Sequence, residues 1–225
     1  MPFKAENKQD YTKLRSIKRA NVSKAFVEEQ SEDLKNSIKS VPTIIIFRNG
    51  KPIARLEAGL SMKIETKLIS FPEGIVLKSG DKLDSFDLMV ETYGELNELK
   101  TNAVLVCHAF SGNHIAAGKK DDVTGWWNQI IGPDKAINTN DYFVVCCNNL
   151  GGCSGSSGPT TMNPATNKPF GVDFPQVTVD DWVNSQKMLM DKLDIPYWHL
   201  VAGGSLGGMQ ALQWSVAYPD KVKKL

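Results

Sequence analysis

The feature that most constrains the fold is the sequence Gly-Gly-Ser-Leu-Gly-Gly at residues 203–208. The apolar run at residues 198–202 predicts a buried strand before it, and residues 206–218 predict a helix after it that ends at a proline. A Gly-x-Ser-x-Gly sequence between a strand and a helix is typical of a sharp turn that presents a nucleophilic serine. The chain is therefore expected to contain an α/β sheet, in which strands alternate with helices.

Ser205 is the candidate nucleophile of this turn. Its backbone is expected to be strained, and the small residues Gly203 and Gly207 would let the strand and the helix approach each other. The hydroxyl would then lie beside a helix N-terminus, with the backbone N–H of Leu206 pointing to where an oxyanion forms. A glycine-rich turn can also serve packing alone, but the strand and helix around this one favour the catalytic interpretation.

A second oxyanion donor is expected in the loop after an earlier strand. Residues 103–107 form a continuous apolar run, which predicts a strand buried on both faces. The next residues are His-Ala-Phe-Ser-Gly, and the N–H of Phe110 is the candidate donor. His108 could act as a base, but its place at the end of a buried strand favours an orienting or packing role. His114 and His199 are weaker candidates, and His199 is expected to be a strand residue.

Other segments after residue 62 continue the alternation of strands and helices. Residues 86–93 and 142–147 predict strands, and residues 179–193 predict a helix with two aspartates in its first turn, where acids complement the helix dipole. This order predicts a mostly parallel sheet.

The first 61 residues differ from the rest in charge and composition. Residues 1–61 hold 12 basic and 7 acidic side chains, a balance of +5, whereas residues 62–225 hold 14 and 18, a balance of −4. All tryptophans, cysteines and histidines lie in the second part. The contrast predicts two domains, 1–61 and 62–225, although one domain with a basic N-terminal extension would show the same charges.

The first part predicts a hairpin, with strands at residues 43–47 and 51–57 and an Asn-Gly turn between them. Its string VPTIIIFRNG, at residues 41–50, resembles the C-terminal half of thioredoxin, which implies a partial thioredoxin-like α/β segment. Dithiol exchange needs a CxxC pair, and no cysteine precedes Cys107. A packing or tethering role is therefore expected for this part.

Long and uncommon strings run through residues 62–225. They are FPE (71–73), YGELN (93–97), CHAFSGNH (107–114), GWW (125–127), IGP (131–133), FVVCCNNLGGCSGSSGP (143–159), NPA (163–165) and GGSLGGMQALQW (203–214). These strings resemble those of homoserine O-acetyltransferase, a family of the α/β-hydrolase superfamily. One departure is Ile115, where relatives commonly carry a second histidine.

The resemblance implies a partial α/β-hydrolase fold that transfers an acyl group. Ser205 would attack the thioester of acetyl-CoA while the amides of Phe110 and Leu206 hold the oxyanion, and the acetyl-serine would then acylate the hydroxyl of L-homoserine, a step of methionine biosynthesis. Acetyl-CoA is thus a substrate, and no cofactor or metal is implied. A succinyl donor or a serine hydrolase of the same fold are the alternatives.

Transfer without hydrolysis requires a site that excludes water. Trp126, Trp127 and the loop at residues 150–159 are candidate walls, although ordinary packing would explain them equally well.

The catalytic triad of this fold follows the chain order Ser, Asp, His. The 20 residues after Ser205 contain one aspartate, Asp220, and no histidine. The chain is therefore expected to be truncated and to have negligible acetyltransferase activity, because an unactivated serine hydroxyl is a poor nucleophile. Residues 221–225 predict the start of another strand, which would leave residues 198–202 as an aggregation-prone sheet edge. A non-catalytic scaffold, an incomplete gene fragment or a mis-joined reading frame would explain the same facts.

Composition and motifs exclude several other classes. With 41% apolar residues, 23% charged residues and a net charge of +1, the chain is neither disordered nor a generic nucleic-acid arm. No apolar run approaches the roughly 20 residues of a membrane span, and the N-terminus lacks the apolar core of a secretory signal, which favours the cytoplasm. The four cysteines match no CxxC or metal-ligand spacing and are expected to be free thiols. The resemblance also suggests a homodimer.

Overall fold

The computed structural model describes residues 43–48, 51–57, 62–120 and 122–225. The chain divides into two compact units, Met1–Ser61 and Met62–Leu225. In the first unit, β1 (Thr43–Arg48) and β2 (Lys51–Glu57) pair as an antiparallel hairpin, as predicted. The Asn-Gly turn and all residues before Thr43 lie outside the described residues, so the resemblance to thioredoxin stays a prediction.

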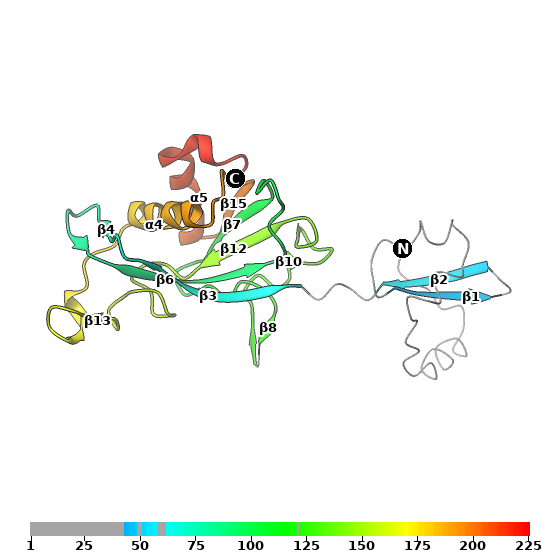
Figure 1. Ribbon diagram of the computed structural model, residues 1–225, viewed down its shortest axis with the longest axis horizontal. Helices are drawn as coiled ribbons and strands as arrows, with labels where there is room; N and C mark the ends of the chain where they lie inside the picture. Colours follow the sequence, from blue (N-terminus) through cyan, green and yellow to red (C-terminus); the bar gives the residue numbers. More distant parts are fainter. Residues whose placement is uncertain (1–42, 49–50, 58–61, 121) are drawn as a thin grey trace. The chain divides into compact units, whose positions relative to one another are not determined.

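The second unit is built on a five-stranded sheet in the order β15-β7-β12-β6-β3 (Figure 1). Its strands are β3 (Ile64–Phe71), β6 (Phe86–Tyr93), β7 (Ala103–Cys107), β12 (Phe143–Cys147) and β15 (Leu200–Gly203). The strands β15, β7 and β12 are parallel, whereas β6 pairs antiparallel with both β12 and β3. The sheet is therefore mixed, and its parallel part carries the glycine-rich turn.

Two helices pack together on one side of this sheet (Figure 1). They are α4 (Val179–Lys192) and α5 (Leu206–Ala217), close to their predicted bounds. The helices share one apolar core with Leu105 of β7, while Val104 and Val106 face a second core on the other side of the sheet. Alternate side chains of a strand point to opposite faces, so β7 is buried on both, as its continuous apolar sequence predicted.

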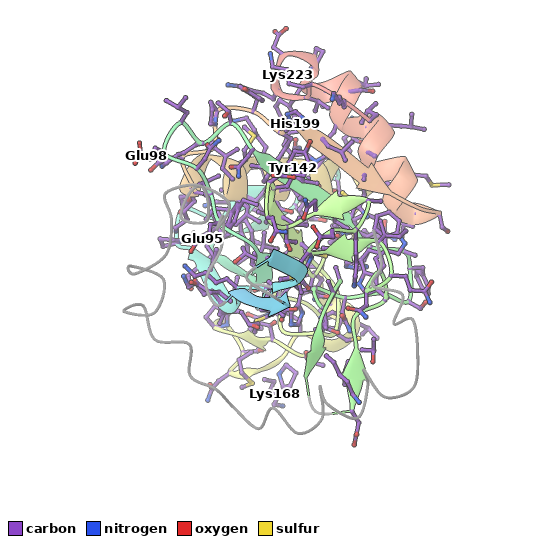
Figure 2. The ribbon with its side chains drawn as sticks, turned by 90° about the vertical axis from the view of Figure 1, so that its right-hand side faces the viewer. Glu95, Glu98, Tyr142, Lys168, His199 and Lys223 are labelled. Atoms are coloured by element: carbon purple, nitrogen blue, oxygen red, sulfur yellow. The ribbon has the colours of Figure 1, made fainter. Side chains whose placement is uncertain are left out.

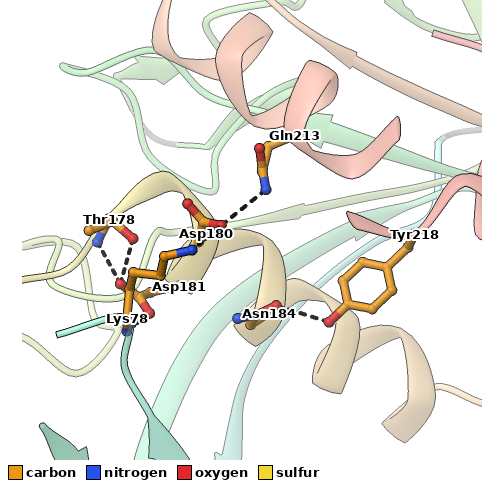
Figure 3. Close-up of polar contacts among 7 residues, drawn as sticks. All are labelled: Lys78, Thr178, Asp180, Asp181, Asn184, Gln213 and Tyr218. Carbon is orange, nitrogen blue, oxygen red and sulfur yellow. Dashed lines mark hydrogen bonds and ion pairs between the residues drawn. The ribbon is translucent and has the colours of Figure 1, made fainter. Parts of the chain in front are cut away.

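Polar contacts fix α4 at its N-terminus and against α5 (Figure 3). Asp181, which is fully buried, accepts hydrogen bonds from the backbone N–H and hydroxyl of Thr178 and from the backbone N–H of Lys78, all within 2.8 Å. Toward α5, Gln213 donates to Asp180 at 3.1 Å, and the Tyr218 hydroxyl donates to Asn184 at 2.9 Å. Asp181 thus acts as a capping residue that also ties α4 to a distant turn.

The outer edge of β15 is partly paired by the residues that follow α5. β15 begins at Leu200, two residues later than predicted, and Trp198 forms an isolated parallel bridge with Val222 of this segment. The Val201 N–H also donates to the Lys224 carbonyl at 3.0 Å. The segment predicted to enter another strand therefore lies along β15.

Short elements fill the connections. They are β4 (Ile75–Val76), β5 (Lys82–Leu83), β8 (Lys119–Lys120), β9 (Val123–Thr124), β10 (Ile131–Gly132), β11 (Ile137–Asn138), β13 (Met162–Asn163), β14 (Lys168–Pro169), η1 (Gly171–Asp173) and η2 (Pro219–Lys221). No helix among the described residues is long and apolar enough to cross a membrane.

Candidate active site

Ser205 occupies the turn between β15 and α5 with φ 55° and ψ −125°. Positive φ is rare for a residue with a side chain, and such a conformation costs roughly 1–3 kcal/mol. Its side chain is exposed at the start of the helix. The strained backbone that the sequence predicts for a nucleophile elbow is thus present at Ser205.

Gly203 and Gly207 have no room for a side chain. A Cβ atom at Gly203 would lie 2.4 Å from the carbonyl carbon and oxygen of Gly207, and one at Gly207 would lie 2.1 Å from the Cys107 carbonyl oxygen. The missing side chains therefore let α5 begin directly against the ends of β15 and β7.

A network of buried amides holds α5 against α4 and β7. Gln186 of α4 donates to the side-chain oxygen of Gln210 at 2.6 Å and accepts from the Trp214 indole at 2.7 Å. Gln210 in turn donates to the His108 carbonyl at 3.4 Å. No motif in the sequence predicts this network. The signal that could have indicated it is a glutamine at a core position of each helix, and both side chains are essentially unexposed.

His108 is buried, and both of its ring nitrogens are engaged. Nδ1 donates to the Ala109 carbonyl at 2.7 Å, and Nε2 accepts the Asn149 N–H at 3.1 Å. Burial lowers the pKa of His108, which favours this neutral form. The ring therefore joins the loops after β7 and β12, which is an orienting role and not that of a free base.

The candidate oxyanion donors, Phe110 and Leu206, follow the carboxyl-terminal ends of two neighbouring parallel strands. The β15–β7 register places Gly203 beside Cys107, so the turn with Ser205 and the loop with Phe110 leave level strand ends. Within the described part of the chain, no hydrogen bond uses the backbone N–H of Phe110 or Leu206. Both amides are thus available, and their oxyanion role stays a prediction.

A cleft of about 520 Å³ lies beside Ser205. It is lined by Trp127, Val201, Ala202, Gly203, Ser205, Gly208, Met209, Ala211, Leu212 and Leu225. Apart from the Ser205 hydroxyl and the Trp127 indole N–H, the side chains of this lining are apolar. Trp127 therefore forms the wall that the sequence predicts, and Trp126 packs against it with ring centroids 5.1 Å apart.

The loop at residues 150–159, the other predicted wall, does not line this cleft. Its Ser156 and Ser157 hydroxyls instead accept the backbone N–H groups of Met89 and Asp87 in β6, at 3.0 and 2.8 Å. These bonds hold the loop against β6 and away from the cleft, so the prediction that it forms a wall there is wrong.

His199 lies at the opposite end of β15 from Ser205. Its N–H donates to the Ala103 carbonyl at 2.7 Å, and its ring packs on Tyr142 with centroids 5.2 Å apart (Figure 2). It directly precedes β15, so the prediction that it is a strand residue is wrong by one position, and it is too remote to activate the serine.

Cysteines and other possible metal ligands also occur in the described part of the chain. No group of three or more metal-ligating side chains occurs there, and the cysteines are free. Burial raises the pKa of the Cys107 and Cys146 thiols and that of Cys147 to about 12, so these thiols stay protonated.

Residues 102–225 match the protein family described as alpha/beta hydrolase fold, which is more than half of the chain. The chain therefore belongs to the alpha/beta hydrolase fold family, and the predicted fold class is confirmed. Within this class it is 57% identical over 162 residues to a homoserine O-succinyltransferase from Hahella chejuensis (strain KCTC 2396). That match covers 71% of this chain and 42% of the relative.

Two solved structures superpose on this chain over 71–72% of its length. A homoserine O-acetyltransferase from Bacillus anthracis superposes with a TM-score of 0.65 at 37% identity, over 72% of this chain and 45% of that one. Esterase E22 superposes with a TM-score of 0.66 at 38% identity, over 71% and 46%. The chain thus spans less than half the length of these relatives. The predicted likeness to homoserine acyltransferases is supported, with the succinyl name in the curated relative and the acetyl name in the solved structure.

Proposed function

We propose that residues 62–225 form the nucleophile-bearing part of a homoserine O-acyltransferase. The observation that carries the proposal is the strained Ser205 at the mouth of an apolar cleft, in a chain 57% identical to a homoserine O-succinyltransferase. The same residues form the elbow that acyl transfer through a serine requires.

In the proposed reaction, Ser205 Oγ forms a bond to the thioester carbonyl carbon, and the N–H groups of Phe110 and Leu206 stabilise the oxyanion. The carbon–sulfur bond then breaks, and coenzyme A leaves with the proton that a base took from the serine. The homoserine hydroxyl next attacks the acyl-serine, and its proton returns to Ser205 Oγ as O-acylhomoserine forms. No step requires a redox cofactor.

His108 and His199 are not placed to act as the base for these proton transfers. His108 uses both ring nitrogens in hydrogen bonds, and His199 lies at the far end of β15. The 225-residue polypeptide alone is therefore expected to have negligible transferase activity.

The donor is proposed to be succinyl-CoA, since the succinyl name belongs to the relative at 57% identity and the acetyl name to a structure at 37%. Acetyl-CoA is the second candidate. Hydrolysis of an ester is the other candidate reaction, favoured by the likeness to esterase E22. Transfer requires that water be kept from the acyl-serine, and the apolar side chains beside Ser205 are proposed to contribute to this exclusion.

A chimera tests the proposal. Residues 62–225 are joined to the remaining C-terminal part of the Hahella chejuensis relative, and O-acylhomoserine is measured by mass spectrometry with succinyl-CoA or acetyl-CoA. We expect homoserine-dependent product, mainly with succinyl-CoA, and loss of at least about a thousandfold in the Ser205→Ala variant. Release of coenzyme A at the same rate without homoserine would instead support a hydrolase. Product in the Ser205→Ala variant would contradict the nucleophile assignment.

A further inference from the structure

A buried carboxylate and a buried phenol that the proposed reaction does not use lie in β6. The side chains of Glu91 and Tyr93 are 3% and 0% exposed, on the face of the sheet away from the helices. The Tyr93 hydroxyl donates to Glu91 Oε1 at 2.6 Å, and the Thr66 hydroxyl of β3 donates to Oε2 at 2.7 Å. Both carboxylate oxygens are therefore hydrogen-bonded inside the protein.

The Tyr93 oxygen also holds the loop that follows β7. It accepts the backbone N–H groups of Ala116 at 2.6 Å and Ala117 at 3.1 Å. A phenol has one proton, and donating it to Glu91 leaves the oxygen lone pairs for the two amides. Burial raises the pKa of Tyr93, so this proton is retained.

The same loop is hydrogen-bonded to the tryptophans beside the cleft. The backbone N–H of Trp127 donates to the Ala116 carbonyl at 2.8 Å, and the indole N–H of Trp126 donates to the Asn113 carbonyl at 2.9 Å. Trp127 lines the cleft beside Ser205. A continuous set of hydrogen bonds thus joins Glu91 to that wall.

We propose that Glu91 and Tyr93 are positioning residues that hold the loop at residues 113–118 and, through it, the Trp127 wall of the Ser205 cleft. Burying a carboxylate is costly, and an apolar side chain would fill the same space at lower cost. The carboxylate has a specific effect here: it accepts the hydrogen bond of the Tyr93 hydroxyl in preference to the His114 carbonyl, which lies 3.2 Å from the same hydroxyl. The inference rests on the proposed function only in taking the Ser205 cleft as the reaction site.

Tyr93→Phe in the full 225-residue chain tests the hydroxyl. We expect amide hydrogen exchange at Ala116 and Ala117 to become about tenfold faster, while exchange within α4 changes less than about twofold. The indole N–H resonances of Trp126 and Trp127 should move, and those of the other tryptophans should not. Tyr218→Phe is the matched control, because it removes a hydroxyl hydrogen bond on the α4–α5 side and should leave Trp126 and Trp127 unchanged.

A pair of variants at Glu91 tests the carboxylate. Glu91→Leu should reproduce the changes of Tyr93→Phe. Glu91→Gln should instead keep the original tryptophan resonances, because its carbonyl oxygen can accept from the Tyr93 hydroxyl and its amide can donate to Thr66. Should Glu91→Leu not fold, Tyr93→Phe and Glu91→Gln decide the question. Equal acceleration of exchange throughout the unit in Tyr93→Phe, or unchanged Ala116 and Ala117 exchange, would overturn the proposal. These measurements need no acyl transfer, so their outcome is separate from that of the chimera.

Discussion

Ser205 and Trp127 line the same cleft, but different physical means hold them in place. The turn at Ser205 depends on backbone contacts at Gly203 and Gly207, where an added carbon would overlap carbonyl groups. Trp127 depends on hydrogen bonds that lead back to the buried Tyr93. The first kind of support tolerates no added atom, whereas the second can lose one group and leave the rest in contact.

The largest expected effect comes from adding one carbon to the turn. Gly207→Ala should lower the free energy of unfolding by about 4 kcal/mol, because the new Cβ lies 2.1 Å from the Cys107 carbonyl oxygen and must displace α5. Chemical denaturation measures this. Gly204→Ala is the matched control, since a Cβ there has no atom within 4 Å, and it should change stability by less than about 0.5 kcal/mol. Equal losses in both variants would contradict the steric account.

A smaller loss is expected where hydrogen bonds also support the elbow helix. Gln186→Met keeps the side-chain length but leaves the Trp214 indole N–H and the Gln210 side-chain oxygen without their partner, which should cost about 2 kcal/mol. If Gln186→Met lowers the free energy of unfolding nearly as much as Gly207→Ala, the elbow also depends on side-chain hydrogen bonds, and the contrast with the tryptophan wall does not hold. A double-mutant cycle with Gln210→Met measures the coupling directly.

The smallest effect has the opposite sign. Ser205→Gly should raise the free energy of unfolding by about 1 kcal/mol, because glycine adopts a φ of 55° with little strain. Ser205→Ala retains a Cβ and is the control, with stability expected within about 0.5 kcal/mol of the original. A gain in both variants would show that the hydroxyl, and not the backbone, is the source of instability.

The elbow was predictable because its signals are local. The strand, the turn and the helix follow one another along the chain, and the need for small residues around Ser205 is visible within six positions. The strands at residues 86–93 and 103–107 were likewise predictable from their apolar patterns. The antiparallel placement of β3 and β6 was not, because pairing direction depends on the path of the connections.

The hydrogen-bonded supports were not predictable from any motif. Tyr93 and Ala116 are 23 positions apart, Gln186 and Gln210 are 24 apart, and Lys78 and Asp181 are 103 apart. A glutamine or a glutamate in an apolar segment gives no indication of which distant group it will meet. Trp127 was predicted as a wall only through the family resemblance, together with the loop at residues 150–159, and the structure places only Trp127 of these two beside Ser205, 78 positions away.

The sequence by itself determined the strand–turn–helix around Ser205 and the buried interior strand β7, because these depend on neighbouring residues and their periodicity. The family likeness of residues 62–225 came from the resemblance of their long, uncommon strings. Only the tertiary structure decided that His108 is held at both nitrogens, that the loop at residues 150–159 packs on β6, and that Glu91 reaches the wall of the cleft through Tyr93. Hydrogen bonds between distant segments exist only once the chain is folded, since folding alone brings those groups within bonding distance.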